Sequence, residues 1–230
     1  MVAAKVMFTT DIAASVTKIA IAFIPMLLGM VCHEVAHGWV AYKLGDPTAK
    51  SQGRLTLNPT PHIDPMGTAM FVLTALTSPF IIGWAKPVPV DSRWFKNPRK
   101  GMILVSVAGP FTNFLLAVTF GILFAFVAQS APTPGSLYAS VYDFLHNMCV
   151  AGVWINLTLG WFNLMPFPPL DGSHIVAGLL PPRLSYKFQS LSRYGFILII
   201  LLLATGFLGR IISPLITGSA DLIQQLIFLI

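Results

Sequence analysis

The sequence predicts an all-α integral membrane protein: a polytopic helical bundle of about 5–6 transmembrane segments, with short membrane-associated β-strands or a re-entrant loop. Of its 230 residues, 55% are hydrophobic and only 10% are charged, whereas about a quarter of the residues of a soluble domain are charged. The mean hydropathy is +0.76. We therefore expect residues 1–230 to form one membrane-embedded domain, with a core at about 18–180 and accessory C-terminal membrane segments at 181–230.

The net charge of +6 does not indicate a nucleic-acid partner, because the basic residues are confined to the loops between apolar runs. Basic residues at such places orient a protein in the bilayer. Cys32 and Cys149 both lie in apolar runs and imply no disulfide framework.

The first membrane helix is expected at about 18–44, because an apolar run ends there at the helix-stopping sequence Gly45-Asp46-Pro47. Thr9, Thr10 and Asp11 precede this run and can cap a helix. The next segment, 48–65, alternates polar and apolar residues at Arg54–Leu57 before several prolines. We predict a short strand and a loop there.

Residues 66–85 are apolar but interrupted by Thr77-Ser78-Pro79 and by Gly83. They either span the membrane or form a re-entrant pair. Residues 86–100 are basic, and Pro87 and Pro89 exclude a helix there and fit an edge strand or a polyproline-like segment.

Two further membrane helices are predicted at about 101–129 and 139–165. The prolines of residues 166–169 end the second of these. After a polar turn, two more apolar segments follow at about 194–209 and 212–230, and the first is short for a span.

The first membrane helix carries the sequence His33-Glu34-Val35-Ala36-His37. This HExxH spacing puts both histidines on one helix face, where they can hold one metal ion. Glu34 can act as a general base on a water molecule bound to that metal. An ionisable group at membrane depth is costly and usually marks function, so we favour a metal site over a histidine pair that merely packs between helices.

A catalytic zinc site needs a third protein ligand, and Glu34 is the only glutamate of the sequence. This excludes a metalloprotease class that uses a second glutamate as ligand. Asp171 is favoured because prolines precede it and Gly172 allows a sharp turn. The alternatives are a turn-forming Asp-Gly at the membrane surface, or ligation by another residue, with His174 able to replace or support Asp171. The remaining candidates are the other aspartates, His62 and His146.

If Asp171 shares a metal with the HExxH histidines, the ends of the first and third helices must face the same side of the membrane. Residues 66–85 must then return to the side that they left, and 11 of the 14 Lys and Arg residues lie on the side of the site. If residues 66–85 simply span the membrane, 10 Lys and Arg residues lie on one side and 4 on the other. Both distributions are uneven, but only the first brings the metal ligands to one side, and the positive-inside rule then places the site near the cytoplasmic face.

Three motifs in this order resemble those of site-2 proteases, the intramembrane zinc metalloproteases. They are the HExxH run, Gly109–Asn113, and the stretch from Asn163 through Asp171 to Gly172. The resemblance extends over roughly residues 20–180 and is strongest to the compact bacterial and archaeal branch, without a PDZ or CBS domain.

This resemblance implies one Zn²⁺ per chain, held by His33, His37 and Asp171, with Glu34 as the base. It implies that Asn113 lies near the scissile carbonyl as a substrate anchor or oxyanion donor, and that Asn163 binds the unwound substrate backbone. Packing and interhelical hydrogen bonds are the alternative roles for both asparagines. The segments near 54–57 and 86–90 are expected to pair with substrate as an added strand.

The expected function is therefore regulated intramembrane proteolysis in a prokaryotic cell membrane, by a multi-pass enzyme in the lipid bilayer. The expected partner is a single-pass transmembrane protein substrate, cleaved within or near its helix. A non-catalytic zinc-binding membrane scaffold or metal carrier is the alternative. The intact Glu34 disfavours it, because metal binding alone requires no base between the ligands.

Overall fold

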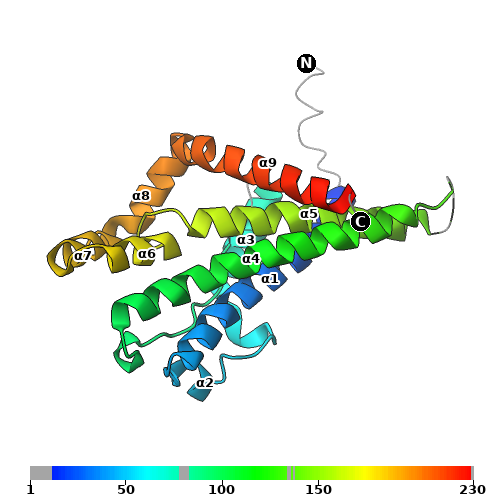
Figure 1. Cartoon of the computed structure of the whole chain (residues 1–230). Helices are drawn as coiled ribbons and strands as arrows, with labels where there is room; N and C mark the ends of the chain where they lie inside the picture. The colour runs from blue at the N-terminus through cyan, green and yellow to red at the C-terminus, as the bar shows by residue number, and fades with distance from the viewer. Residues whose placement is uncertain (1–11, 78–82, 134–135, 137, 229–230) are drawn as a thin grey trace.

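The computed structural model describes residues 12–77, 83–133, 136 and 138–228, and Figure 1 shows them as a bundle of helices. The prediction of an all-α architecture is confirmed. The α-helices are α1 (Ile12–Lys43), α2 (Thr48–Ser51), α3 (Pro65–Thr77), α4 (Pro98–Gln129), α5 (Ala139–Asn163), α6 (Asp171–Leu179), α7 (Pro182–Gln189), α8 (Ser192–Ala204) and α9 (Phe207–Phe228), with short 3-10 turns at Thr60–His62 and Ser92–Trp94.

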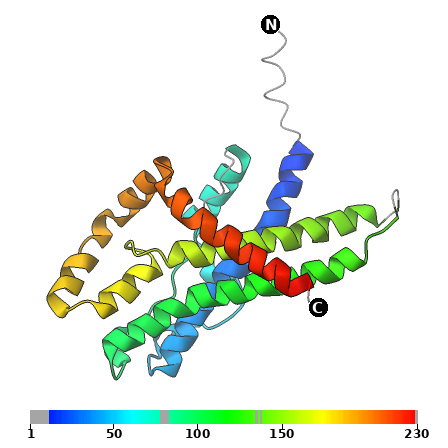
Figure 2. The same ribbon diagram turned by 45° about the horizontal axis from the view of Figure 1, so that its top comes forward.

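The centre of the bundle is formed by α1, α4 and α5, which pack against one another. The helix α9 crosses α5 and α4 on the outside of this group (Figures 1 and 2). Ala117, Leu157 and Ile223 make a buried cluster where α4, α5 and α9 meet. The helix α4 also packs against α6, so it contacts both α1 and α6.

Within the described part of the chain, two helices are long and apolar enough to cross a membrane, over Val16–Lys43 and Pro98–Gln129. A bent pair, Pro182–Gly195 with Ile197–Ala204, makes a third if it counts as one span. Large apolar side chains of α4 such as Phe111 and Phe126 face outward, as in a protein whose surroundings are lipid rather than water. The helix predicted at 139–165 forms as α5, but it carries Asp143, His146 and several asparagines and is not among these spans.

The predicted end of the first helix is confirmed. The helix α1 stops at Lys43, and Gly45 follows with a φ of +108°, a conformation that favours glycine. The Asp46 carboxylate is fully buried and accepts hydrogen bonds from the backbone N–H groups of Thr48 and Asp91, at 2.9 and 2.7 Å. The residues proposed to cap this helix, 9–11, lie outside the described residues.

The two ends of the 66–85 segment lie side by side. Ile63 pairs with Ala85 in an isolated antiparallel bridge, and the Lys86 N–H donates to the His62 carbonyl at 2.8 Å. Between them α3 leads away from this point and the chain returns to it at Gly83. Part of the predicted interruption falls on 78–82, which lie outside the described residues. The described start and end of this segment are thus bonded to each other.

The strand predicted at 54–57 is wrong, because the described residues contain no strand beyond that single bridge. Residues 86–90 form neither a helix nor a strand, so of the two predicted alternatives the edge strand is wrong. Backbone groups of both segments are bonded to other partners. In the first segment the Arg54 N–H donates to the Ala49 carbonyl, and the Thr56 carbonyl accepts from His62 Nε2. In the second segment, prolines remove two N–H donors and Arg54 donates to the Lys86 and Pro87 carbonyls.

The C-terminal boundaries differ from those predicted. The polar turn after α6 contains the helix α7, and the last two helices meet at Thr205-Gly206 instead of near residue 210. Gly206 has a φ of +69°, which explains the break at this position.

Candidate metal centre

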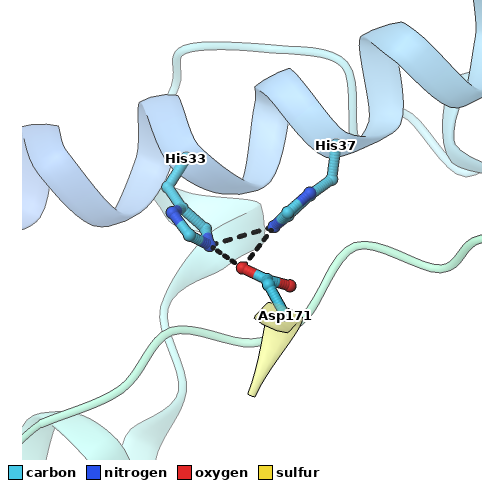
Figure 3. Close-up of side chains that lie close together, drawn as sticks. All are labelled: His33, His37 and Asp171. Atoms are coloured by element: carbon cyan, nitrogen blue, oxygen red, sulfur yellow. Dashed lines mark hydrogen bonds and ion pairs between the residues drawn. The ribbon is translucent and has the colours of Figure 1, made fainter. Parts of the chain in front are cut away.

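His33 and His37 lie one turn apart on α1 and point the same way (Figure 3). Both side chains are buried, with 7% and 8% of their surface exposed. Their Nε2 atoms are 2.9 Å apart. The HExxH spacing therefore brings the two imidazoles together as predicted from the helical period.

Asp171 is the first residue of α6 and reaches across to both imidazoles (Figure 3). Its Oδ2 atom lies 3.1 Å from His33 Nε2 and 3.3 Å from His37 Nε2. The same oxygen is buried and has no hydrogen-bond partner. His33, His37 and Asp171 thus form a group that could hold a metal ion, and it contains the three predicted ligands.

The outer nitrogen of each imidazole is held by an acceptor. His37 Nδ1 donates to the Val105 carbonyl at 2.7 Å, and His33 Nδ1 donates to Asn113 Oδ1 at 2.7 Å. A carbonyl oxygen can only accept, so each neutral ring carries its proton on Nδ1 and turns an Nε2 lone pair inward. These two lone pairs and the Asp171 oxygen converge without a donor among them.

Three converging acceptors repel one another unless a cation lies between them. The distances of 2.9, 3.1 and 3.3 Å are slightly shorter than or equal to the lower end of the separation of about 3.3–3.6 Å expected for ligands at about 2.0–2.2 Å from a tetrahedral metal. Two imidazoles and a carboxylate, with further positions left open, are a donor set that suits zinc. The residues present therefore fit the metal that the motif predicts.

Asn113 is fully buried in α4, and its amide group is completely used. Besides accepting from His33, it donates from Nδ2 to the Gly29 carbonyl and to Asn156 Oδ1, at 3.2 and 3.1 Å. Asn156 is also fully buried and donates to the Gly152 carbonyl in α5 at 2.9 Å. This chain of amides links α5, α4 and α1 to a metal ligand. Sequence reasoning did not assign Asn156 a role, and its only signal was an amide inside an apolar run.

The close approach of α5 and α6 places Asp171. A Cβ atom on Gly172 would overlap the backbone of Leu164 and Met165 at the end of α5. Gly172 has no positive φ, so the expectation that it permits a sharp turn is wrong. It is instead a contact residue inside the first turn of α6. Its missing side chain lets Asp171 sit near the end of α5.

A carboxyl group binds a metal in its ionised form, so Asp171 would bind the metal as a carboxylate.

Glu34 is half-buried on α1 between the two ligand histidines. Its Oε2 atom accepts a hydrogen bond from the backbone N–H of Val88 at 2.7 Å. Val88 belongs to the proline-rich segment that was expected to pair with substrate, so this N–H and the carbonyls bound to Arg54 are already used.

The other candidates lie apart from the ligand group. His62 is buried and hydrogen bonds through Nε2 to the Thr56 carbonyl, and the His146 ring lies against Phe124 and Tyr142. His174 lies one turn beyond Asp171 on α6, and burial lowers its pKa. Asn163 is half-buried and donates to the Leu159 carbonyl of its own helix at 3.0 Å.

An HExxH pair and a carboxylate gathered inside an apolar helical bundle define a membrane metallopeptidase. The chain belongs to peptidase family M50, whose family model matches residues 21–203. This is the family that the three sequence motifs indicated.

Curated relatives extend over most of the chain. It is 39% identical to "Putative zinc metalloprotease YwhC" of Bacillus subtilis over 206 residues, covering 88% of this chain and 89% of that protein. It is 29% identical to the similarly named Rip2 of Mycolicibacterium smegmatis, covering 80% and 66%. It is 25% identical to a zinc metalloprotease of Methanocaldococcus jannaschii, covering 73% of this chain but 36% of that protein. No solved structure matches the chain significantly.

Proposed function

We propose that this protein is an intramembrane zinc endopeptidase that cleaves single-pass membrane proteins within or near their transmembrane helices. One observation supports this above all: His33, Glu34 and His37 lie inside a helix long and apolar enough to span a membrane, with Asp171 against both histidines. A hydrolytic site at that depth acts on peptide bonds that are themselves in the bilayer.

Zinc is the metal that the donor set and the names of the curated relatives support. When bound, it lowers the pKa of a water molecule into the neutral range. His33, His37 and Asp171 hold it, while Asn113 and the Val105 carbonyl fix the two imidazoles from behind.

Glu34 acts as the general base. Its carboxylate lies on the same helix turn as the ligands, takes the proton from the attacking water, and returns it to the leaving amine. Glu34 Oε2 accepts from Val88, and the other oxygen, Oε1, remains for the proton.

Asn163 is our proposed contact to the unwound substrate backbone. It is half-buried at the end of α5, close in sequence to the loop that leads to Asp171. The two asparagines differ, because Asn113 already uses both its amide oxygen and its amide nitrogen in hydrogen bonds within the protein. A direct role of Asn113 at the scissile carbonyl requires that these bonds rearrange.

We further propose a multi-pass arrangement in the cell membrane with the metal site toward the cytoplasm. The side-by-side ends of the 66–85 segment support a re-entrant path. With that path, 11 of 14 Lys and Arg residues lie on the side of the site.

The test uses the purified full-length protein in liposomes with a reporter that has one transmembrane helix and an epitope tag at each end. Wild type is expected to cut the reporter within or next to its helix, and Glu34→Gln to keep one zinc per chain while losing at least about a hundredfold in rate. Cleavage by Glu34→Gln at the wild-type rate would refute the mechanism. Zinc binding without cleavage of any such reporter would favour the scaffold alternative.

A further inference from the structure

One peptide group lies between a buried cation and the proposed base. The carbonyl of Pro87 accepts a hydrogen bond from Arg54 Nη2 at 3.1 Å, and the N–H of Val88 donates to Glu34 Oε2 at 2.7 Å. Both belong to the peptide unit that joins Pro87 to Val88. Arg54 also donates from Nη2 to the Lys86 carbonyl at 2.6 Å.

Arg54 is unusually placed for a guanidinium group. Only 6% of its surface is exposed, its Nε atom has no hydrogen-bond partner, and it makes no direct ion pair within the described part of the chain. A buried charge without a counter-charge is destabilising. The nearest compensation is indirect: the peptide dipole turns its oxygen toward Arg54 and its N–H toward the Glu34 carboxylate.

The segment that carries this peptide is stiff. Pro87 and Pro89 fix their own φ angles, and Pro89 restricts Val88 to extended conformations. The Val88 side chain is buried against α1, because a Cβ on Gly38 would lie 2.8 Å from Val88 Cγ1. Gly38 is one helical turn after Glu34, on the same face of α1. The N–H therefore reaches Glu34 from a backbone with few alternative positions.

We propose that Arg54 is a positioning residue for Glu34, acting through the Pro87–Val88 peptide. Arg54 holds the carbonyls of the segment, the segment presents the Val88 N–H, and this N–H fixes one oxygen of the carboxylate. The inference rests on the proposed role of Glu34 as the base. Misplacing a catalytic group by about 1 Å can reduce the rate about a hundredfold, which is the scale of effect expected here.

The test compares Arg54→Met, which removes the donors and the charge, with Arg54→Lys, which retains a cationic donor. Asp46→Asn is the matched control, because Asp46 is a buried side chain that bonds to the same chain segment at Asp91, away from Glu34. For each variant we would measure kcat and KM on the liposome reporter, zinc per chain and thermal unfolding.

A second readout is independent of activity. Val88 is the only residue of 87–89 with a backbone N–H, and its signal in ¹⁵N-valine protein can be assigned from the spectrum of Val88→Ile. Its hydrogen-exchange rate in the resting protein is expected to rise at least about tenfold in Arg54→Met and in Glu34→Gln. Asp46→Asn is expected to leave it within about threefold of wild type.

Arg54→Met is expected to lower kcat about a hundredfold with KM within about threefold and zinc retained. Arg54→Lys should have a kcat at least about tenfold higher than that of Arg54→Met. Asp46→Asn should keep a kcat within about threefold of wild type, even if its unfolding temperature is lower. If Arg54→Met does not fold, Arg54→Leu, which likewise has neither a donor nor a charge, takes its place with the same expectations.

Wild-type kcat or unchanged Val88 exchange in Arg54→Met would overturn the inference. So would parallel losses of activity and stability in Arg54→Met, Arg54→Lys and Asp46→Asn. An inactive Glu34→Gln beside a fully active Arg54→Met would refute this inference alone, whereas an active Glu34→Gln would refute the proposed function.

Discussion

Gly109 of α4 lies directly against the imidazole of His37. A Cβ atom built on this glycine would be 2.5 Å from His37 Nε2 and 2.6 Å from His33 Nε2. The α4 backbone therefore closes one side of the metal-binding group, and it can do so only where no side chain is present. This explains why the second sequence motif begins with glycine.

Gly109→Ala is expected to abolish zinc binding, or to reduce it to less than about a tenth of wild type, because the added methyl group occupies the position of the ligand nitrogens. Zinc per chain in purified protein measures this. Gly218→Ala is the control, since a Cβ there meets no atom within 4 Å. Full zinc content in Gly109→Ala would show that the helices have room to separate.

Asp171→Ala is expected to lose most of the bound zinc, because it leaves two ligands where a stable site needs three. The measurement is zinc per chain beside wild type and His174→Ala, both purified in the same detergent. His174→Ala should keep its zinc, since His174 is not in the ligand group. If Asp171→Ala kept its zinc and His174→Ala lost it, the third ligand would be His174 and not Asp171.

Asn113→Ala is expected to weaken zinc binding about tenfold to a hundredfold, the usual effect of removing a group that orients a ligand histidine. Competition with a zinc chelator measures the affinity. Asn163→Ala serves as the matched amide control and should bind zinc as wild type does, while raising KM for the reporter. Equal zinc affinity in Asn113→Ala and Asn163→Ala would contradict this prediction and favour a role of Asn113 in substrate binding.

The re-entrant path that we propose for residues 66–85 predicts which sides of the membrane can be labelled. In a background without Cys32 and Cys149, Ile63→Cys and Lys86→Cys should react with an impermeant thiol reagent from the same side. Ala131→Cys, in the loop after α4, should react from the opposite side. Labelling of Ile63→Cys and Lys86→Cys from different sides would show that the segment spans the bilayer.

Patterns within one helix were predictable from the sequence, and so were the residues that the three motifs mark. The HExxH spacing predicted the meeting of His33 and His37, and Gly45-Asp46-Pro47 predicted the end of α1. The motif order predicted that Asp171 would join the two histidines, although these residues lie far apart in the chain. These features depend on helical periodicity and on residue types with few alternative roles.

Contacts between loops and helices were not predictable. The strand expected at 54–57 did not form, because the Arg54 N–H and the Thr56 carbonyl are bonded to Ala49 and His62. At 86–90, Arg54 holds the Lys86 and Pro87 carbonyls that an edge strand would have used. The bond from Val88 to Glu34 joins residues 54 positions apart and leaves no mark on the local pattern. The role of Gly172 depends on how closely α6 approaches the end of α5, which is a matter of packing.

The metal ligands come from α1 and from the start of α6, and this division has a consequence during synthesis. A nascent chain that has inserted only as far as α4 holds the two imidazoles and Glu34 but not Asp171. The ribosome must complete α5 before the third ligand can reach the others. The metal-binding group is therefore incomplete until most of the polypeptide has been synthesised. We expect a partly synthesised chain to be unable to hydrolyse other proteins at the site where it is inserted.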